Sequence, residues 1–475
     1  MAANTPSTDL KEQLKAKFVG QSLGAINTPA AVLDLAKVEV NCERMLDATD
    51  KLKLSWRAHI KSHKTTELTR LQIGHERTTP VSIITSTVIE AENILPLLQE
   101  YQSKGRHVNL LFAFPLFPSA VSRLACFASQ LGPSSLSVMV DHPDQLASVA
   151  AIARGSGHPL LVFIKIDANY GRAGVVQDSP ACARLIDAVL AAEQEAGTCL
   201  LYGVYCHAGQ SYGAREDWAA MHALAAEFAE LSKVAALVRA KSPGHPLVLS
   251  VGATPTATTI QHPTLGATAE TAATSSAAPT HEIERLFAEL KRDGFTLEVH
   301  AGVYPTLDLQ QLATHARDSS LMTYEDIAIS VLAEVASIYP GRGAQGTTEA
   351  LINAGCLALG REPVTDKGAV PGRDFSGWGI LMPWGGLENN PTPGPEFPRV
   401  HGGWQVGKVS QEHGILVWKG SKEDEVPLRI GQKVRVWPNH SCIAGACFDW
   451  YLVVDSRNKG REDEVVDVWP RWRGW

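Results

Sequence analysis

The stretch that decides the fold is WRAHIKSHKT, residues 56–65, in which apolar and basic side chains alternate from Arg57 to Lys61. A period of two is typical of a β-strand, so Arg57, His59 and Lys61 would share one face. Lys61 would close the strand before a polar turn, where (β/α)8 barrels carry their catalytic groups. An amine partly desolvated among other cations has a lowered pKa and can act as nucleophile or base. The pattern also fits a basic strand end on the surface, or a patch that steers phosphate.

Apolar strand candidates alternate with helical segments from residue 34 to about residue 317. After the lysine strand, strands are expected at 81–85, 108–113, 135–140, 159–166, 202–207, 247–251 and 296–299, with helices between them. Repeated strand–helix units predict a parallel sheet, and about eight units close into an α/β barrel of the (β/α)8 TIM type. An open doubly wound sheet is the alternative. Residues 257–280, rich in Ala, Thr and Ser, predict an exposed, flexible insertion.

The pattern changes at about residue 318, where helical spacing becomes scarce. Short strand candidates separated by turn residues are expected at 327–339, 350–355, 403–410, 414–418, 431–437 and 450–456. These predict a C-terminal, mostly β domain over residues 318–475. Ahead of the barrel, residues 1–33 form an N-terminal segment with a short helix at 10–18 and a strand-like run that begins at 28.

Composition excludes several classes of function. The 475 residues carry a net charge of −7, so no global basic field would hold nucleic acid or an anionic membrane. No apolar run approaches the roughly 20 residues that a membrane span needs. The first ten residues lack the apolar core of a secretory signal. The eight cysteines are scattered without the spacing of a disulfide framework, which favours a reducing, cytoplasmic compartment.

Two glycine-bearing motifs follow predicted strand ends. KIDANYGRAG, residues 165–174, places Arg172 in a turn, where a guanidinium can donate to a phenolate or a carboxylate. GVYCHAGQSY, residues 203–212, places Tyr205 and His207 on one face, where a flat imidazole can stack on an aromatic ring. Taken alone, the first motif also fits an ordinary polar loop, and the second a satisfied core histidine.

Two further segments have the small residues that anion-binding turns require. SVGATPT (250–256) and VHAGVY (299–304) follow successive late strands, and glycine lets backbone N–H groups approach a phosphate closely. TIM-type phosphate cups form at that part of a barrel. In the β domain, PNHSC (438–442) places His440 and Cys442 two residues apart. Imidazole and thiolate are good zinc ligands, but two ligands make an incomplete site, which chance spacing also explains.

Taken together and in this order, the motifs resemble those of the D-serine dehydratase family, within the alanine racemase-like (fold type III) pyridoxal phosphate enzymes. The resemblance spans residues 28–475. It implies that Lys61 binds pyridoxal 5'-phosphate, with Lys64 as the weaker candidate, and that His207 stacks on the cofactor ring. Arg172 would lie near the phenolic oxygen, and Tyr205 and Tyr212 would contact cofactor or substrate. The phosphate would be held by Ser250, Gly252, Thr254, Gly302, Val303 and Tyr304, and His300 would face the pyridine nitrogen.

The resemblance also implies a metal. PNHSC is similar to the family's zinc motif, so His440 and Cys442 would bind Zn²⁺, with Glu412 or His413 behind them. Asn353 and the pair Ala168-Asn169 depart from the family pattern. The expected protein is a homodimer in which residues 1–33 pack with the β domain. A small-molecule D-amino acid is its expected partner.

The implied activity is a pyridoxal phosphate- and zinc-dependent D-serine dehydratase, which eliminates hydroxide from D-serine and yields pyruvate and ammonia. A D-threonine aldolase-type lyase and a D-3-hydroxyaspartate dehydratase use similar parts. An amino-acid racemase would leave the metal motif idle. A non-catalytic pyridoxal phosphate-binding protein would not need residues 320–475, and a structural zinc protein would not need the phosphate turns.

Overall fold

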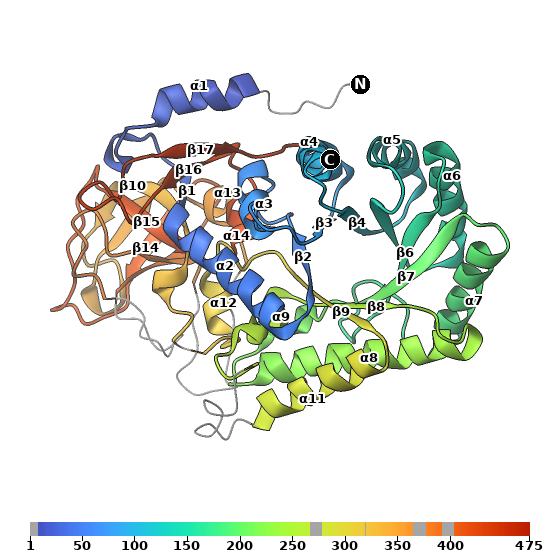
Figure 1. Cartoon of the computed structure of the whole chain (residues 1–475). Helices are drawn as coiled ribbons and strands as arrows, with labels where there is room; N and C mark the ends of the chain where they lie inside the picture. The colour runs from blue at the N-terminus through green and yellow to red at the C-terminus, as the bar shows by residue number, and fades with distance from the viewer. Residues whose placement is uncertain (1–7, 267–277, 319, 363, 365–376, 392–402) are drawn as a thin grey trace.

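The computed structural model describes residues 8–266, 278–318, 320–362, 364, 377–391 and 403–475. Eight parallel strands form a closed barrel, on the right in Figure 1, and a second, mostly antiparallel sheet lies on the left. The predicted (β/α)8 barrel with a β domain is therefore confirmed, and the open doubly wound sheet is wrong. The barrel strands are β2 (Ser55–His59), β3 (Val81–Thr85), β4 (Val108–Pro115), β5 (Leu136–Val140), β6 (Leu160–Lys165), β7 (Cys199–Tyr205), β8 (Val248–Val251) and β9 (Thr296–Ala301).

Helices surround the barrel on its outside. In α2 (Leu35–Leu52) the side chain of Asp34 accepts a hydrogen bond from the amide of Ala36 and so caps the first turn. Val38, Cys42 and Met45 recur every three or four residues and are buried, which gives the helix its one apolar face. The helices that follow are α3 (Thr66–Gln72), α4 (Val88–Ser103), α5 (Val121–Leu131), α6 (Leu146–Ser156), α7 (Pro180–Gln194), α8 (Ala219–Lys241), α9 (Thr254–Thr258), α11 (Ala278–Arg292) and α12 (Leu309–Ala313).

The barrel interior is partly polar. Arg57 is fully buried, and its Nε donates to Oε1 of Glu298 at 2.7 Å while Nη1 donates to Oδ1 of Asn109 at 2.7 Å. A buried ion pair is costly to desolvate, and the further hydrogen bond to Asn109 offsets part of that cost. Ala58 and Ile60, which alternate with Arg57 and His59, belong instead to the apolar core under the helices. The period of two thus separates the two faces of the strand.

The β domain contains a closed ring of six strands. Its order is β10, β11, β14, β13, β12 and β15, and the ring closes because β10 pairs with both β11 and β15. Trp404 and Trp418 pack edge to face inside it. The elements of the domain are α1 (Thr8–Phe18), β1 (Ala30–Asp34), β10 (Ile329–Tyr339), β11 (Glu349–Ile352), α13 (Cys356–Leu359), β12 (Gly379–Leu381), β13 (Trp404–Val409), β14 (Gly414–Trp418), β15 (Lys433–Pro438), α14 (Ser441–Ala444), β16 (Trp450–Val454) and β17 (Asp467–Pro470).

The N-terminal strand belongs to this sheet although the barrel follows it in the chain. β1 lies between β10 and β16, with Ala30 opposite Leu332 and Val32 opposite Leu452. Asn353, which departs from the family pattern, joins the N-terminal segment to the rest of the β domain. Its Nδ2 donates to Oγ1 of Thr28 at 2.8 Å, and its Oδ1 accepts from the amide of Glu334. An amide side chain supplies both the donor and the acceptor that this position uses.

The predicted flexible insertion at 257–280 is wrong over its first part. Residues 257–261 form the end of α9 and a 3-10 turn, and Ala257 and Ile260 are buried against neighbouring helices. Small side chains allow such close packing, so a composition rich in Ala and Thr does not require exposure. α11 begins at Ala278, and residues 267–277 lie outside the described residues.

Two short strands, β12 and β17, were not expected from the sequence, because three or four residues carry too little periodicity. The predicted lysine strand also ends two residues early, at His59, so that Lys61 lies in the loop after β2. Among the described helices, none combines the length and the apolar composition needed to cross a membrane.

Candidate active site

The loop after β2, residues 61–65, lies at the carboxyl end of the barrel and carries two lysines. Burial lowers the pKa of the Lys61 amine, and Arg172 lowers it further, while Cys442 opposes both. A larger share of neutral amine is therefore present near neutral pH than for an ordinary lysine. This is the state that a nucleophile or a base requires.

Lys64 has a different environment. Its Nζ lies 3.1 Å from Oε1 of Glu90, whose side chain is fully buried, and 5.6 Å from the centre of the Trp475 ring. The contact with Glu90 engages the Lys64 amine outside the site and leaves it unavailable for reaction. The geometry thus favours Lys61 over Lys64 as the reactive amine.

His207 follows β7 and is held as a neutral ring. Its Nδ1 lies 2.8 Å from the carbonyl oxygen of Gly252, and since a carbonyl only accepts, Nδ1 carries the hydrogen. Burial, together with the neighbouring Lys61 and Arg172, lowers the pKa of His207 well below its usual value. A neutral imidazole fixed in one orientation at the barrel mouth is suited to stack on a planar ligand.

The turn around Arg172 contains Ala168 and Asn169, the pair that departs from the family pattern. Asn169 adopts φ 61°, a left-handed conformation that Asn tolerates better than most other residues with a side chain. Oδ1 of Asp167 accepts from the amides of Tyr170 and Gly171 at 3.0 Å each. Arg172 itself is exposed, and its guanidinium lies 5.4 Å from the centre of the Tyr170 ring.

The two glycine turns after β8 and β9 meet each other. The amide of Val303 donates to Oγ1 of Thr254 at 3.0 Å. Gly252 has φ 148°, and a Cβ there would lie 2.1 Å from the carbonyl oxygen of His300. At Gly302 a Cβ would lie 3.0 Å from Oγ of Ser62, next to Lys61. A side chain is thus excluded at Gly252 and disfavoured at Gly302, and the two turns pack closely on His300 and on the lysine loop.

Two of the residues expected at the phosphate use their side chains elsewhere. Oγ of Ser250 donates to Oε1 of Glu298 at 2.7 Å and lies 3.1 Å from Nδ1 of His300, inside the barrel. The ring of Tyr304 packs edge to face on Trp56 at 5.2 Å, in the core behind the barrel wall. The side chains of Ser250 and Tyr304 are therefore engaged away from the glycine turns.

His440 is the N-cap residue of α14, just after β15, and Cys442 lies in the single turn of that helix; this His440–Cys442 turn packs onto the lysine loop. Sγ of Cys442 lies 3.2 Å from Oγ of Ser62. Nδ1 of His440 lies 2.5 Å from Oε1 of Gln310, and the amide of Ser441 donates to Oδ2 of Asp308 at 2.8 Å. The β domain thus delivers the His–Cys pair to the barrel mouth of the same chain.

The two side chains stabilise each other as ions. Burial opposes both charges, yet Cys442 raises the pKa of His440 to about 9, and His440 lowers the pKa of Cys442. A thiolate beside an imidazole suits zinc, because the metal binds the thiolate and displaces the imidazole proton. Among the described residues, no group of three or more His, Cys, Asp or Glu side chains could hold a metal. In the described part of the chain, His440 and Cys442 are therefore the candidate ligands for an ion at this place.

The structure places the two predicted tyrosines, Tyr205 and Tyr212, and the Glu412–His413 loop in three different environments. The ring centre of Tyr212 lies 6.3 Å from that of His440, so Tyr212 lies beside the His440–Cys442 turn. Tyr205 stacks on His300 at 4.2 Å and an interplanar angle of 9°, inside the barrel. Glu412 and His413 are exposed in the loop between β13 and β14, and no contact joins them to His440 or Cys442 in the described part of the chain.

Sequence reasoning missed two buried ionisable residues. Oε1 of Glu227, on α8, accepts from the amides of Ala208 at 2.8 Å and Gly252 at 3.3 Å, and so joins the His207 loop to the glycine turn. Its signal was a single acid on the apolar face that carries Leu224 and Leu231. Lys165 closes β6, and burial lowers its pKa to about 8. Its Nζ lies 5.0 Å from the centre of the Tyr205 ring.

The barrel with a desolvated lysine at its mouth, joined to an antiparallel β domain, defines the alanine racemase-like class. Residues 118–268 match the family described as "Alanine racemase, N-terminal domain", and residues 328–454 match the "Putative serine dehydratase domain". The chain is 36% identical to a D-serine dehydratase of Schizosaccharomyces pombe over 98% of this chain and 96% of that protein. A D-serine dehydratase of Saccharomyces cerevisiae is 31% identical, over 97% and 99%. The chain belongs to the D-serine dehydratase family.

A solved structure extends the comparison. The D-threo-3-hydroxyaspartate dehydratase of Delftia sp. HT23 is 27% identical and superposes with a TM-score of 0.69, covering 96% of this chain and all of that one. Two further solved structures, each 27% identical, are of D-threo-3-hydroxyaspartate dehydratase mutants: a cysteine-to-alanine mutant in the metal-free form and a histidine-to-alanine mutant, at positions two residues apart.

Proposed function

We propose that the chain is a pyridoxal phosphate- and zinc-dependent D-serine dehydratase, which converts D-serine to pyruvate and ammonia. One observation carries the proposal: within a single chain, the His440–Cys442 turn packs on the loop of Lys61, with 3.2 Å between Cys442 Sγ and Ser62 Oγ. An amine beside a metal-ligand pair supplies the groups that β-elimination of a hydroxyl requires. The two D-serine dehydratases of yeasts, similar over nearly the whole chain, support it.

The residues present fit pyridoxal phosphate. Lys61 would hold it covalently, the amides around Gly252 and Gly302 would face its phosphate, and His207 would lie against its ring. Buried Nε2 of His300 has no hydrogen-bond partner in the described structure, as expected for an atom whose partner is a ligand. When bound, the cofactor withdraws electrons from the Cα of an amino acid.

The chain's own residues would then move one proton and hold the leaving group. The Lys61 amine, with its lowered pKa, removes the α-proton, because it is partly neutral near neutral pH. Zn²⁺ held by His440 and Cys442 would act as a Lewis acid on the substrate hydroxyl, which is a poor leaving group by itself. The two D-threo-3-hydroxyaspartate dehydratase mutants support this assignment, since their altered histidine and cysteine have the same spacing as His440 and Cys442.

The experiment is a product assay with D-serine, D-threonine and D-threo-3-hydroxyaspartate, each with and without a chelator. We expect pyruvate and ammonia from D-serine, loss of this activity on chelation, and its return with added Zn²⁺. Glycine with an aldehyde would show a D-threonine aldolase-type lyase instead. Faster turnover of D-threo-3-hydroxyaspartate would assign the chain to that dehydratase, which the 29% identical Delftia relative makes the nearest alternative.

We also propose a homodimer in a reducing, cytoplasmic compartment. All eight cysteines are free, and Cys126 and Cys447 are exposed thiols that an oxidising compartment would modify. Phe114, at the carboxyl end of β4, is 54% exposed, and Phe117 beside it is also exposed. Apolar side chains gathered at the barrel mouth are suited to contact with a second copy. The molar mass of the chain in solution tests the proposed homodimer directly.

A further inference from the structure

A chain of hydrogen bonds runs through the barrel interior from Arg57 to His300. The carboxyl of Glu298 accepts from Nε of Arg57 and from Oγ of Ser250, each at 2.7 Å and both on Oε1. Oγ of Ser250 lies 3.1 Å from Nδ1 of His300. Each of these four side chains is at least nine-tenths buried, so water does not compete for the bonds.

The direction of these bonds follows from the groups themselves. Because a carboxylate paired with arginine only accepts, the single hydroxyl hydrogen of Ser250 is committed to Glu298. Oγ of Ser250 then offers only a lone pair to His300. Nδ1 of His300 must supply the hydrogen, and in a neutral imidazole the other nitrogen, Nε2, is left as a bare acceptor.

The environment of the ring keeps it neutral and leaves Nε2 without a donor. Tyr205 covers one face of His300 at 4.2 Å, and Nε2 is buried with no hydrogen-bond partner in the described structure. The nearby carbonyl of Gly252 is an acceptor too, and it already receives the hydrogen of His207 Nδ1. A bare buried acceptor is costly unless a donor meets it.

We propose that Glu298 and Ser250 are positioning residues that fix His300 as its Nδ1–H tautomer, so that its bare Nε2 accepts a hydrogen bond from a ring N–H of the bound cofactor. This rests on the proposed function, because the donor is the protonated pyridine nitrogen of pyridoxal phosphate. A protonated ring nitrogen makes that ring a stronger electron sink. Arg57, on the basic face of β2, holds the carboxylate of Glu298 in place through their ion pair.

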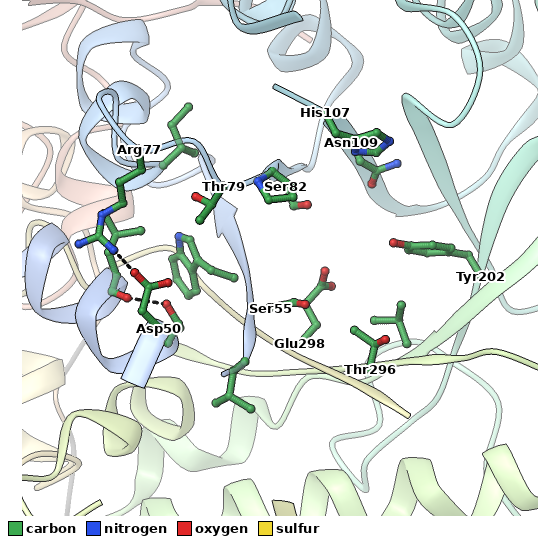
Figure 2. Close-up of a pocket in the computed structure, with 17 residues that line it drawn as sticks. Asp50, Ser55, Arg77, Thr79, Ser82, His107, Asn109, Tyr202, Thr296 and Glu298 are labelled. Carbon is green, nitrogen blue, oxygen red and sulfur yellow. Dashed lines mark hydrogen bonds and ion pairs between the residues drawn. The ribbon is translucent and has the colours of Figure 1, made fainter. Parts of the chain in front are cut away.

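Glu298 occupies an unusual position for such a role. It lines a pocket of about 290 Å³ at the amino ends of the barrel strands, with Ser55, Ser82, Tyr202 and Thr296 (Figure 2). This is the end of the barrel opposite Lys61. Substitutions at Glu298 or Ser250 therefore act through His300, and Ser82, which lines the same pocket without joining the hydrogen-bond chain, offers a matched control.

The first test reads the tautomer directly, in the full chain labelled with ¹⁵N-histidine, before and after pyridoxal phosphate is added. We expect His300, assigned by its loss in His300→Asn, to show a protonated Nδ1 and a bare Nε2. Ser250→Ala should give a mixture of tautomers, whereas Ser250→Thr and Ser82→Ala should match the wild type. An Nε2–H tautomer in the wild type, or no change in Ser250→Ala, overturns the proposal.

The second test measures cofactor binding. Ser250→Ala and Glu298→Gln should weaken pyridoxal phosphate binding about tenfold and change the bound cofactor's absorbance, while Ser250→Thr restores both. An altered tautomer with unaltered cofactor affinity and absorbance would overturn the role of Nε2. Failure of the wild type to take up pyridoxal phosphate would instead refute the proposed function, because the tautomer before addition is measured independently.

Discussion

The lysine loop, residues 61–65, and the His440–Cys442 turn meet in one site, but different structures hold them there. Lys61 follows a strand whose register with both neighbours is fixed, since Ala58 lies opposite Ile83 and Ala301. The His440–Cys442 turn is held by side chains of the barrel that are 130 or more residues away. The position of a strand end therefore follows from the local sequence pattern of its strand. The position of a turn between domains depends on contacts with residues far away in the sequence, which no local pattern shows.

The largest expected effect tests the lysine side of this comparison. Lys61→Ala should abolish the absorbance of bound cofactor and reduce turnover on the order of 10³-fold, because the proton-transfer group is lost. Lys64→Gln should keep the absorbance and most of the turnover, since Lys64 is committed to Glu90. Cofactor titration and steady-state kinetics of both variants measure this. Retained absorbance in Lys61→Ala would move the reactive amine elsewhere.

The next effect separates the turn from the lysine. Cys442→Ala should remove bound metal and lower turnover on the order of 10²-fold, a loss of a few kcal/mol of transition-state stabilisation, while cofactor absorbance stays. Cys447→Ala, a change at an exposed cysteine five residues away, is the matched control and should change neither. Metal analysis and kinetics give the result. Full metal content in Cys442→Ala would show that the two regions do not form one metal-dependent site.

The smallest effect concerns Lys165, which lies on the barrel side among Cys206, Arg172, Glu227 and Asp167. Its pKa of about 8 in the folded chain lies below the ordinary value of 10.5, so the unfolded chain binds more protons between these values. Stability should therefore rise with pH, by about 1 kcal/mol from pH 7 to pH 9 for the cofactor-free wild type relative to Lys165→Met. Denaturant titrations at both pH values measure it. Parallel pH dependence of the two proteins would show that Lys165 titrates normally.

Much of the fold was predictable, because strands and helices carry their own periodicity. β3 and β14 have the predicted bounds, and the barrel and the β domain are both present. The failures have physical causes. Ala257 and Ile260 were expected to be exposed because small and polar residues surround them, but close packing of helices favours small residues.

The candidate site was predictable to a smaller extent. Lys61, His207 and the two glycine turns follow strands, so the pattern indicated their common end of the barrel. Glu227 and Lys165 were missed because an ionisable side chain becomes a site residue only through burial and through the partners that it meets. Ser250 shows the reverse case, since its hydroxyl turns inward to Glu298 rather than toward the phosphate turn.

By itself the sequence determined most of the barrel and β-domain strands and their order, because hydrophobic periodicity and turn residues act over a few neighbouring positions. It also determined the presence of a lysine at a strand end and of a histidine and a cysteine two residues apart. Only the tertiary structure decided that Cys442 reaches Ser62, that Lys61 is desolvated while Lys64 is paired, and that Nε2 of His300 meets no partner among the described residues. Burial and long-range hydrogen bonds set these properties, and both arise only when distant segments pack together.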